Sequence, residues 1–379
     1  MGLKKYLLLF TIGILTLFLL ASCNGTIPTA PIQQPPAVYP IYPEPAPPPD
    51  SALTNTPSAG SETGAEISKD FIDTPDTTKP ELEGARVRVG TLRGPSGMGL
   101  APLMEWAEEG KTINNYHFTL GGSPEEMTAG LISGELDIAS VPTNVASVLY
   151  NRLEGKIQVL NVGTLGGLFI LDATGDIDEI EDLRGRTLNI TGQGGIPQFA
   201  LEHILRQNGI EPGVDIEIIF NVEHSELAAL MIAGRVEIGM LPQPFVTTVL
   251  TQSNDFQIAI GLTEAWEAAN PSTQFVQGVV VARRQFIEEY PDAVRLFIND
   301  HYNSVSYVNE NVDRAAVLME IYEIIPAQIA ARAIPYSNLV HLEGVEMKPM
   351  IEAVLAVLYA ANPQAVGGAM PDEEFFFVG

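Results

Sequence analysis

Cysteine and positive charge are both scarce in this sequence of 379 residues. Its one cysteine rules out an intramolecular disulfide and argues against a metal centre built from several cysteines. Only 20 Lys and Arg oppose 47 Asp and Glu, which gives a formal charge of -27. A general nucleic-acid binder is thereby excluded, because phosphate affinity needs clustered cations that release counterions. The five histidines follow no metal-binding spacing, so no zinc site is predicted and no cofactor is expected.

An export signal is predicted over residues 1–22. Lys4 and Lys5 form a positive start, and residues 6–20 are an apolar stretch shorter than the roughly 20 residues that a spanning helix needs. The stretch ends in Leu20-Ala21-Ser22-Cys23, which resembles a bacterial lipobox with Cys23 as the lipidated residue. The alternative is an ordinary secretory peptide with an incidental cysteine. The lipobox predicts a mature chain that begins at Cys23 and is lipid-anchored to the extracytoplasmic face of the cell membrane.

Residues 23–84 are predicted to be the lipidated cysteine followed by a disordered, proline-rich tether. Residues 24–84 contain 13 of the 28 prolines, nine acidic residues, two Lys and few large aliphatic residues. Such a composition buries too little apolar area to offset the entropy of ordering. As a coil, the tether would span roughly 45 Å. A proline-rich segment can also be a ligand of an SH3-type domain, but a spacer suits the outside of a bacterial membrane better.

From about residue 85, short apolar runs alternate with helical patterns, which is typical of α/β domains. Strands are expected at 86–90, 117–120 and 136–139, with a glycine-rich turn at 94–99 and a helix at about 100–109. Ser123-Pro124-Glu125-Glu126 predicts a helix start, because it offers a serine N-cap, proline at N1 and glutamate at N3. This helix is expected to end at Ser133-Gly134.

The α/β pattern occurs twice in the chain. Residues 132–142 (ISGELDIASVP) match residues 232–242 (IAGRVEIGMLP) position by position at an offset of 100. Upstream, a strand at 187–190, a glycine turn at 191–195 and a helix at 197–208 correspond to the strand, turn and helix at 87–109. Two lobes of one topology are therefore predicted. Each would place a glycine turn and a strand-end proline at the carboxyl edge of its sheet, where open α/β sheets bind ligands.

Two enzyme motifs fail on their spacing. Gly192-Gln193-Gly194-Gly195 resembles part of a dinucleotide fingerprint, but Pro197 stands where the third glycine should be. In Gly94-Pro95-Ser96-Gly97 the glycine follows the serine directly, which does not fit a nucleophile elbow. No catalytic residue is predicted, and the chain is not expected to be an enzyme.

The repeated motif, the two-lobed pattern and the lipobox together resemble the substrate-binding lipoproteins of ABC importers. The similarity is to the nitrate, sulfonate and taurine group, which includes binders of the pyrimidine precursor of thiamine. The resemblance covers roughly residues 85–379. It includes residues 278–283 and 286–291, which are similar to the family's return strand and following helix, and residues 370–375 near the carboxyl end.

This resemblance implies a type II periplasmic-binding fold in which two lobes, each a mainly parallel sheet flanked by helices, are joined by two crossovers. Lobe one would comprise about 85–170 and 265–379, and lobe two about 171–264. The crossovers would lie near 168–174 and 259–264, and a helix would follow at 291–309. A small solute would bind between the closing lobes and pass to a permease that works with an ATPase. The family default is a monomer.

The turns and loops at the two carboxyl edges single out the residues expected to bind the ligand. Arg93 is the only cation in either glycine turn, so it could contact a sulfonate, carboxylate or phosphate in bidentate fashion, or be a solvated surface arginine. Phe245 and Trp266 could stack on a planar ring or pack in the core. Glu264 could accept from an amino group. The full expected set is Arg93, Pro95, Ser96, Gly97, Met98, Ser140, Pro142, Thr143, Asn144, Gly192, Gln193, Gly194, Gly195, Ile196, Gln243, Pro244, Phe245 and Glu264.

The sequence leaves the solute open among anionic, neutral heteroaromatic and amine-bearing molecules. Residues 85–379 carry 16 cations against 38 anions. This acidity tilts the choice toward a neutral or cationic solute, although exposed charges are screened over roughly 8 Å. Two alternatives to an importer component also stay open, namely an accessory ligand sensor for a membrane receptor and an extracytoplasmic enzyme on the same fold.

Overall fold

The computed structural model describes residues 84–379 except 222 and 272. All of them belong to one structural unit, Asp76–Gly379. The predicted signal, Cys23 and the tether up to residue 83 lie outside the described residues. Within the described range, none of the helices combines the length and the apolar character that crossing a bilayer requires.

The first of two sheets has six strands within the described residues. Its parallel part consists of the three strands from the first copy of the repeat. Three further strands extend the sheet by antiparallel pairing. In spatial order the strands are β11 (Leu339–Leu342), β4 (Ile157–Leu165), β10 (Val276–Arg283), β3 (Ile138–Pro142), β1 (Arg86–Leu92) and β2 (Asn115–Gly121).

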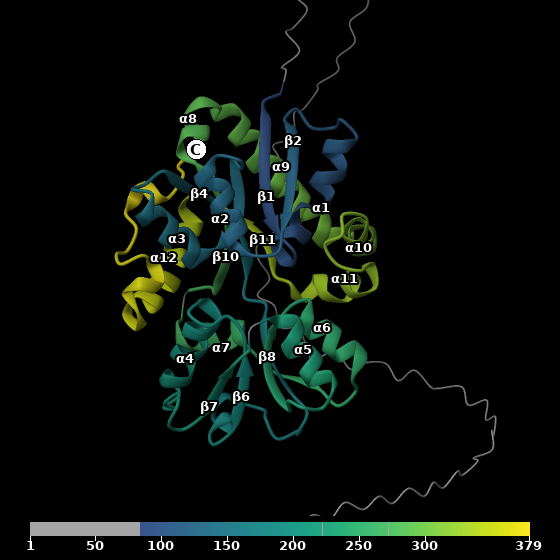
Figure 1. The fold of residues 1–379 in the computed structure, drawn as a ribbon, viewed down its shortest axis with the longest axis vertical. Helices are drawn as coiled ribbons and strands as arrows, with labels where there is room; N and C mark the ends of the chain where they lie inside the picture. Colours follow the sequence, from purple (N-terminus) through teal and green to yellow (C-terminus); the bar gives the residue numbers. More distant parts are fainter. Residues whose placement is uncertain (1–83, 222, 272) are drawn as a thin grey trace, which may run out of the picture. The chain divides into compact units, whose positions relative to one another are not determined.

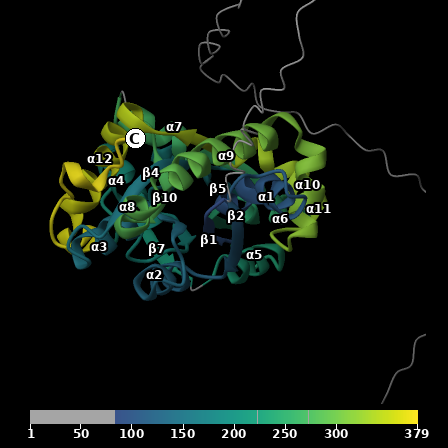
Figure 2. The ribbon, with the colours of Figure 1, turned by 90° about the horizontal axis from the view of Figure 1, so that it is seen from above.

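Helices cover both faces of this sheet, and the side chains of β10 show why. Val280 and Ala282 pack with one hydrophobic cluster, whereas Val279 and Val281 pack with the other. A strand segment buried on both faces is apolar at every position, as are residues 279–282 in β10. Figure 2 shows the helices grouped on two sides. They are α1 (Pro95–Glu108), α9 (Pro291–Glu310), α10 (Val312–Ile321) and α11 (Ala327–Ala333) with the first cluster, and α2 (Pro124–Ser133), α3 (Thr143–Arg152) and α12 (Gly344–Ala361) with the second.

The second sheet has five strands in the part of the chain that the structure describes. Its spatial order is β7 (Glu217–Phe220), β6 (Thr187–Ile190), β8 (Ile238–Pro242), β5 (Leu168–Asp172) and β9 (Gln257–Gly261). Again the repeat strands are parallel, and β5 is antiparallel to both of its neighbours. Its helices are α4 (Ile196–Gln207), α5 (His224–Ile232), α6 (Phe245–Gln252) and α7 (Leu262–Ala269). Figure 1 shows the strands of this sheet in one group and those of the first sheet in another.

The predicted repeat is present as two copies of one unit, β1-α1-β2-α2-β3-α3 and β6-α4-β7-α5-β8-α6. The glycine of each repeated motif ends a helix in the left-handed region, Gly134 at φ 78° after α2 and Gly234 at φ 67° after α5. Glycine is favoured there because it has no Cβ to clash. The two-lobed α/β fold predicted from the sequence is confirmed, with parallel pairing concentrated in these repeat units.

The start of α2 is confirmed in detail. Ser123 Oγ accepts from the backbone N of Glu126 at 3.4 Å, and the Glu126 side chain accepts from the backbone N of Gly122 at 3.2 Å. The prediction of a glycine-rich turn at 94–99 followed by a helix at 100 is wrong, because α1 already begins at Pro95. Proline fixes φ at a helical value at N1, so the turn shrinks to Arg93 and Gly94, and Gly94 adopts φ 123°.

The crossovers also differ from their predicted places. Residues 168–172 and 257–261 are strands of the second sheet, so the chain changes sheets at Gly166-Gly167 and between α7 and β10. The lobe limits near residues 170 and 264 stay a prediction. Five further elements are short, namely α8 (Arg284–Glu289) and the 3-10 turns at Ile180–Leu183, Ile334–Tyr336, Pro363–Val366 and Glu373–Phe375, of which the last three belong to the returning chain.

Candidate ligand-binding site

The carboxyl edges of the two sheets meet at the first crossover. Leu165 ends β4 and pairs with Val276, near the point where Gly278 pairs with Pro142 at the end of β3. Leu168 begins β5 and pairs with Pro242 at the end of β8. Because two residues separate Leu165 from Leu168, the two edges lie within roughly 11 Å of each other at this point.

Helices of one lobe also pack against helices of the other lobe. α12 packs against α4, and α11 packs against α6. The guanidinium of Arg332 in α11 donates to Thr251 Oγ1 in α6 at 3.3 Å. The backbone N of Leu165 donates to the carbonyl of Asn338, and that of Gln243 donates to the carbonyl of Gly167. The segments that follow β1, β3, β6 and β8 therefore start from two edges that the structure brings together.

Four helices begin directly at these edges, and their first turns share one property. α1, α3, α4 and α6 have no acidic residue in the first turn, and their N-cap residues supply no side-chain cap. Free backbone N–H groups and the positive end of the helix dipole are therefore left at each start. At α6 one of these groups is occupied, since Gln243 Oε1 accepts from the backbone N of Thr247 at 3.2 Å.

The remaining long helices are different. Among the described helices of eight residues or more, each of α2, α5, α7, α9, α10 and α12 carries an acidic residue in its first turn. An acid there stabilises a helix by about 0.3–1 kcal/mol, so its presence is the expected state in a chain with 47 acidic residues. The four helices without it are the four that follow the central strands of the repeats.

Small polar side chains lie at the lobe-one edge and are buried. Thr91 in β1 and Thr143 at the start of α3 are fully buried, and neither hydroxyl has a hydrogen-bond partner among the described residues. Ser140 and Asn144, which are close to Thr143 in the sequence, are also buried. A buried hydroxyl without a partner costs about 1–3 kcal/mol, so these two are available to hydrogen-bond a bound molecule.

The lobe-two edge holds a histidine at the start of α5. Its Nδ1 lies 2.5 Å from Thr191 Oγ1, which follows β6, and its ring lies 5.3 Å from that of Phe245, which begins α6. Burial lowers the pKa of His224 to about 4. The imidazole is therefore neutral at physiological pH and brings Thr191 and Phe245 into one cluster.

The structure places the predicted glycine-turn residues at the two edges. Arg93 is exposed at the end of β1 and has no ion-pair partner among the described residues. Gln193 and Gly194 are exposed in the turn before α4, while Gly192 and Gly195 are half-buried. Gln243 is almost fully buried, and its Oε1 also accepts from Thr247 Oγ1 at 2.8 Å. Contact of these residues with a ligand stays a prediction.

Other predicted residues lie in the core or away from the edges. Met98 and Ile196 are buried in hydrophobic clusters at the first turns of α1 and α4. Trp266 is fully buried and stacks on Phe275 at 5.1 Å, which corresponds to the core alternative. Glu264 is exposed in the first turn of α7 and lines a shallow surface depression with residues such as Glu179 and Asn208.

Sequence reasoning missed Thr91, Thr191 and His224 as site residues. The repeat could have drawn attention to them, because Thr91 lies near the end of β1 and Thr191 directly follows the corresponding strand β6. In the same way, position 224 matches position 124, and both positions start the helix that follows an edge strand. His224 fits no metal-binding spacing in the sequence, and in the described part of the chain no group of three potential ligands for a metal is found.

Comparison with known sequences gives two matches. Residues 99–328 match the sequence model of a family described as ABC transporter, phosphonate, periplasmic substrate-binding protein. YtlA of Bacillus subtilis (strain 168), which is named as a binding protein, is 26% identical over 199 residues. The match covers 51% of this chain and 56% of that protein, so the chain spans little more than half of the length of this relative.

Comparison with solved structures shows the same fold at low sequence identity. An ABC transporter structure from Parabacteroides distasonis is 24% identical, with a TM-score of 0.66 over 78% of this chain and 99% of that one. The periplasmic aliphatic sulphonate binding protein SsuA from Escherichia coli is 16% identical, with a TM-score of 0.64 over 77% and 92%. The periplasmic nitrate-binding protein NrtA from Synechocystis PCC 6803 is 13% identical, with a TM-score of 0.54 over 75% and 84%.

Proposed function

The chain belongs to the ABC-transporter phosphonate periplasmic substrate-binding family, and we propose that its solute is a small oxyanion held between the two lobes. As a member of this family it is the substrate-binding component of an ABC transporter, a class that is extracytoplasmic, binds small solutes and works with a permease and an ATPase. The chemical class of the solute is our inference from the site. A phosphonate, a sulfonate or nitrate would fit it.

The observation that carries this proposal is the set of four helix starts without acids. A helix N-terminus presents free N–H donors and about half a positive charge, which favours an anion. α1 and α3 supply two such ends at the edge of the first sheet, and α4 and α6 supply two at the edge of the second. An acid in any of the four first turns would stabilise its helix but repel an oxyanion, so its absence from all four favours an anionic solute.

The side chains at the edges complete the proposed site. Arg93 would add a full positive charge next to α1 and contact two oxygens of the anion at once. The hydroxyls of Thr91 and Thr143 would donate to the remaining oxygens. On the other lobe, neutral His224 would add no charge, and Phe245 would contact the organic part of the solute.

We further propose that the solute closes the lobes and that the lipid anchor keeps the protein at the membrane. A ligand that contacts both edges stabilises the closed form, because the open form lacks half of the contacts. The permease would then receive the solute from the closed monomer. Lipidation at Cys23 and a spacer over residues 24–84 would hold the protein on the extracytoplasmic face, near that permease.

The test introduces an acid into one of the four helix starts. Ser96 is the second residue of α1 and is half-buried, so Ser96→Asp places a carboxylate in the first turn. We expect the variant to bind alkylphosphonate or alkylsulfonate at least about 100-fold more weakly, because like charges about 4 Å apart repel by about 4 kcal/mol near a protein surface. Its free energy of unfolding should stay the same or rise slightly. Isothermal titration and urea unfolding measure the two effects.

Ser96→Asn is the matched control, because asparagine has the size of aspartate without its charge. The control variant should bind within a few-fold of the natural protein. Equal oxyanion affinities for the aspartate and asparagine variants would overturn the proposal. Tighter binding of a cationic solute to the aspartate variant would overturn it as well, since it would show that the site prefers positive charge.

A further inference from the structure

A pocket of about 330 Å³ lies at the opposite, amino-terminal edge of the first sheet. It is built where β1 and β3 begin and where the antiparallel β10 ends, so it is separated from the proposed solute site by the length of the strands. Three arginines and two acids are among its lining residues, which include Arg86, Arg88, Asp137, Arg283, Gln285 and Glu289. This excess of cations is unusual in a chain that carries -27.

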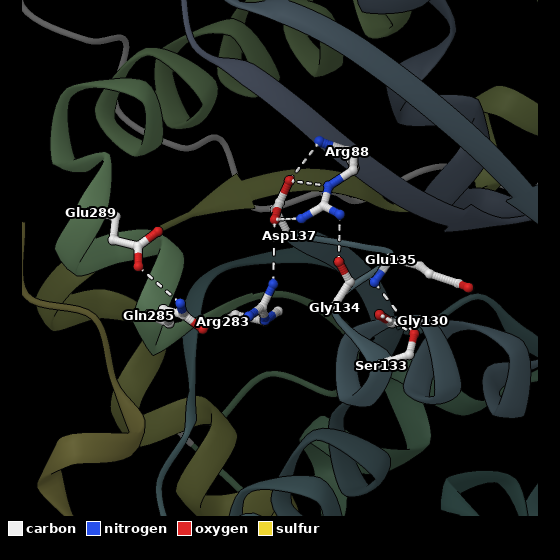
Figure 3. A network of polar contacts seen from close by, with 9 residues as sticks. All are labelled: Arg88, Gly130, Ser133, Gly134, Glu135, Asp137, Arg283, Gln285 and Glu289. Carbon is white, nitrogen blue, oxygen red and sulfur yellow. Dashed lines mark hydrogen bonds and ion pairs between the residues drawn. The ribbon is translucent and has the colours of Figure 1, made fainter.

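Asp137 is the centre of the polar network in this pocket (Figure 3). Its side chain is almost fully buried and accepts from the backbone N of Arg88 at 3.0 Å and from Arg88 Nε at 2.8 Å, with a further contact to Arg88 Nη2. Arg88 also donates to the carbonyl of Gly134. One carboxylate therefore balances Arg88 and holds it in place.

The other two arginines retain free donors. Arg283 Nη1 lies 3.6 Å from Asp137, too far for a good hydrogen bond, and its Nη2 donates to Gln285 Oε1 at 2.7 Å. Arg86 is exposed, and its side chain has no hydrogen-bond or ion-pair partner among the described residues. Glu289 is hydrogen-bonded to Gln285, so no second carboxylate pairs with either arginine in the described chain.

The second lobe shows that the fold does not require these arginines. The pairing of Gly90 with Ala139 matches that of Asn189 with Gly239, which makes Thr187 the counterpart of Arg88 and Gly185 the counterpart of Arg86. The backbone N of Arg283 donates to the carbonyl of Asp137, just as that of Ala173 donates to that of Glu237. Glycine, threonine and alanine thus occupy the three positions in the equivalent copy.

We propose that the pocket at the amino-terminal edge of the first sheet is a second binding site, for a small phosphate or carboxylate anion held by Arg86 and Arg283. The planar guanidinium groups each offer two parallel donors to such an anion. Arg88 and Asp137 hold the pocket in shape, and their ion pair with each other can stay intact when the anion binds. The site is independent of the solute site between the lobes, because it uses different residues at the other end of the strands.

The experiment titrates the full chain with inorganic phosphate and, separately, with succinate. It is performed on Ser96→Asp, in which binding at the solute site is suppressed, so that any remaining binding reports on the pocket. Arg86→Gln is the decisive substitution, because Arg86 is exposed and its loss breaks no contact within the described structure. Arg295→Gln removes the same charge outside the pocket, where the ion pair with Asp292 is exposed, and serves as the control.

We expect Ser96→Asp to retain one site for phosphate or succinate, and the anion that binds identifies the class. Adding Arg86→Gln or Arg283→Gln should weaken this binding at least about tenfold, because each removes a charge-assisted contact. Adding Arg295→Gln should leave it within about twofold. The proposal is overturned if Ser96→Asp binds neither anion, or if Arg86→Gln binds like Arg295→Gln. Either outcome would leave the proposed function intact, because that rests on the difference between Ser96→Asp and Ser96→Asn.

Discussion

At the scale of residues, a buried histidine pair in the first lobe predicts that the protein loses stability in acid. The Nδ1 atoms of His301 in α9 and His341 in β11 lie 2.7 Å apart, and both side chains are almost fully buried. Burial lowers the pKa of His341 to about 4, and burial together with the neighbouring ring lowers that of His301. One ring must donate and the other accept, so protonating the accepting Nδ1 would break the contact.

The sign of the pH effect follows from where protons bind. In the unfolded chain a histidine takes up a proton below about pH 6.5, whereas His341 in the folded chain does so only near pH 4. The free energy of unfolding should therefore fall as the pH drops from 6.5 toward 4, by up to about 1.4 kcal/mol per pH unit for each such histidine. His341→Gln should reduce this slope, as measured by urea unfolding at pH 6.5, 5.5 and 4.5.

His117→Gln is the control for this prediction, because His117 is exposed on β2. Its slope should match that of the natural protein. If His341→Gln and His117→Gln lose stability with pH at the same rate, burial of the histidine pair does not limit stability in acid.

Individual residues were the hardest to predict from the sequence. Arg93 and Thr143 were predicted to lie at the sheet edge because they follow predicted strands, whereas His224 was not singled out because a lone histidine carries no signal of its own. Its hydrogen-bond partner, Thr191, is 33 residues away in the sequence, and the two side chains meet only because β6 and β7 are adjacent in the sheet. Similarly, nothing in the sequence near Asp137 shows that Arg283 approaches it from the return strand.

At the scale of elements, the first crossover contains a glycine whose replacement by any residue with a side chain is expected to destabilise the fold. Gly166 has φ 40°, and a Cβ added there would lie 1.8 Å from Thr263 Oγ1 in α7. Gly166→Ala should therefore lower the free energy of unfolding by at least about 2 kcal/mol, through backbone strain and the steric clash together. Urea unfolding of the variant and of the natural protein measures the difference.

Gly175→Ala separates the two contributions. Gly175 has φ 74°, but nothing lies within 4 Å of an added Cβ, so only backbone strain is expected, of about 1 kcal/mol. Equal losses for the two variants would show that the crossover is not tightly packed against α7.

Elements within one repeat were predictable, whereas connections between the lobes were not. The offset of 100 and the capping residues at 123–126 place strands and helices close to where they are found, since both signals are local. The crossovers were misplaced because β10, more than 100 residues downstream, pairs between β3 and β4. Which sheet a strand such as β5 joins is decided by that long-range pairing and by the partner β8, neither of which a local pattern contains.

For the whole molecule, the net charge and the local charge at the proposed site favour different solutes. The chain carries -27, which by itself favours a neutral or cationic solute. The structure shows instead that acids are distributed unevenly, with none in the first turns of α1, α3, α4 and α6. Since exposed charges are screened over roughly 8 Å, our proposal gives the local arrangement of helix starts more weight than the distant acids. The predicted ABC substrate-binding family is confirmed by the match over residues 99–328.

The central claim is that this substrate-binding protein takes an oxyanion. Its most direct test is a thermal-unfolding titration of the full chain with methylphosphonate, ethanesulfonate, nitrate and an aminopyrimidine. We predict that at least one oxyanion raises the melting temperature in a saturable way, with stabilisation of about 2.7 kcal/mol at 100 times its dissociation constant. Stabilisation by the aminopyrimidine alone, with no effect of any oxyanion, would contradict the claim.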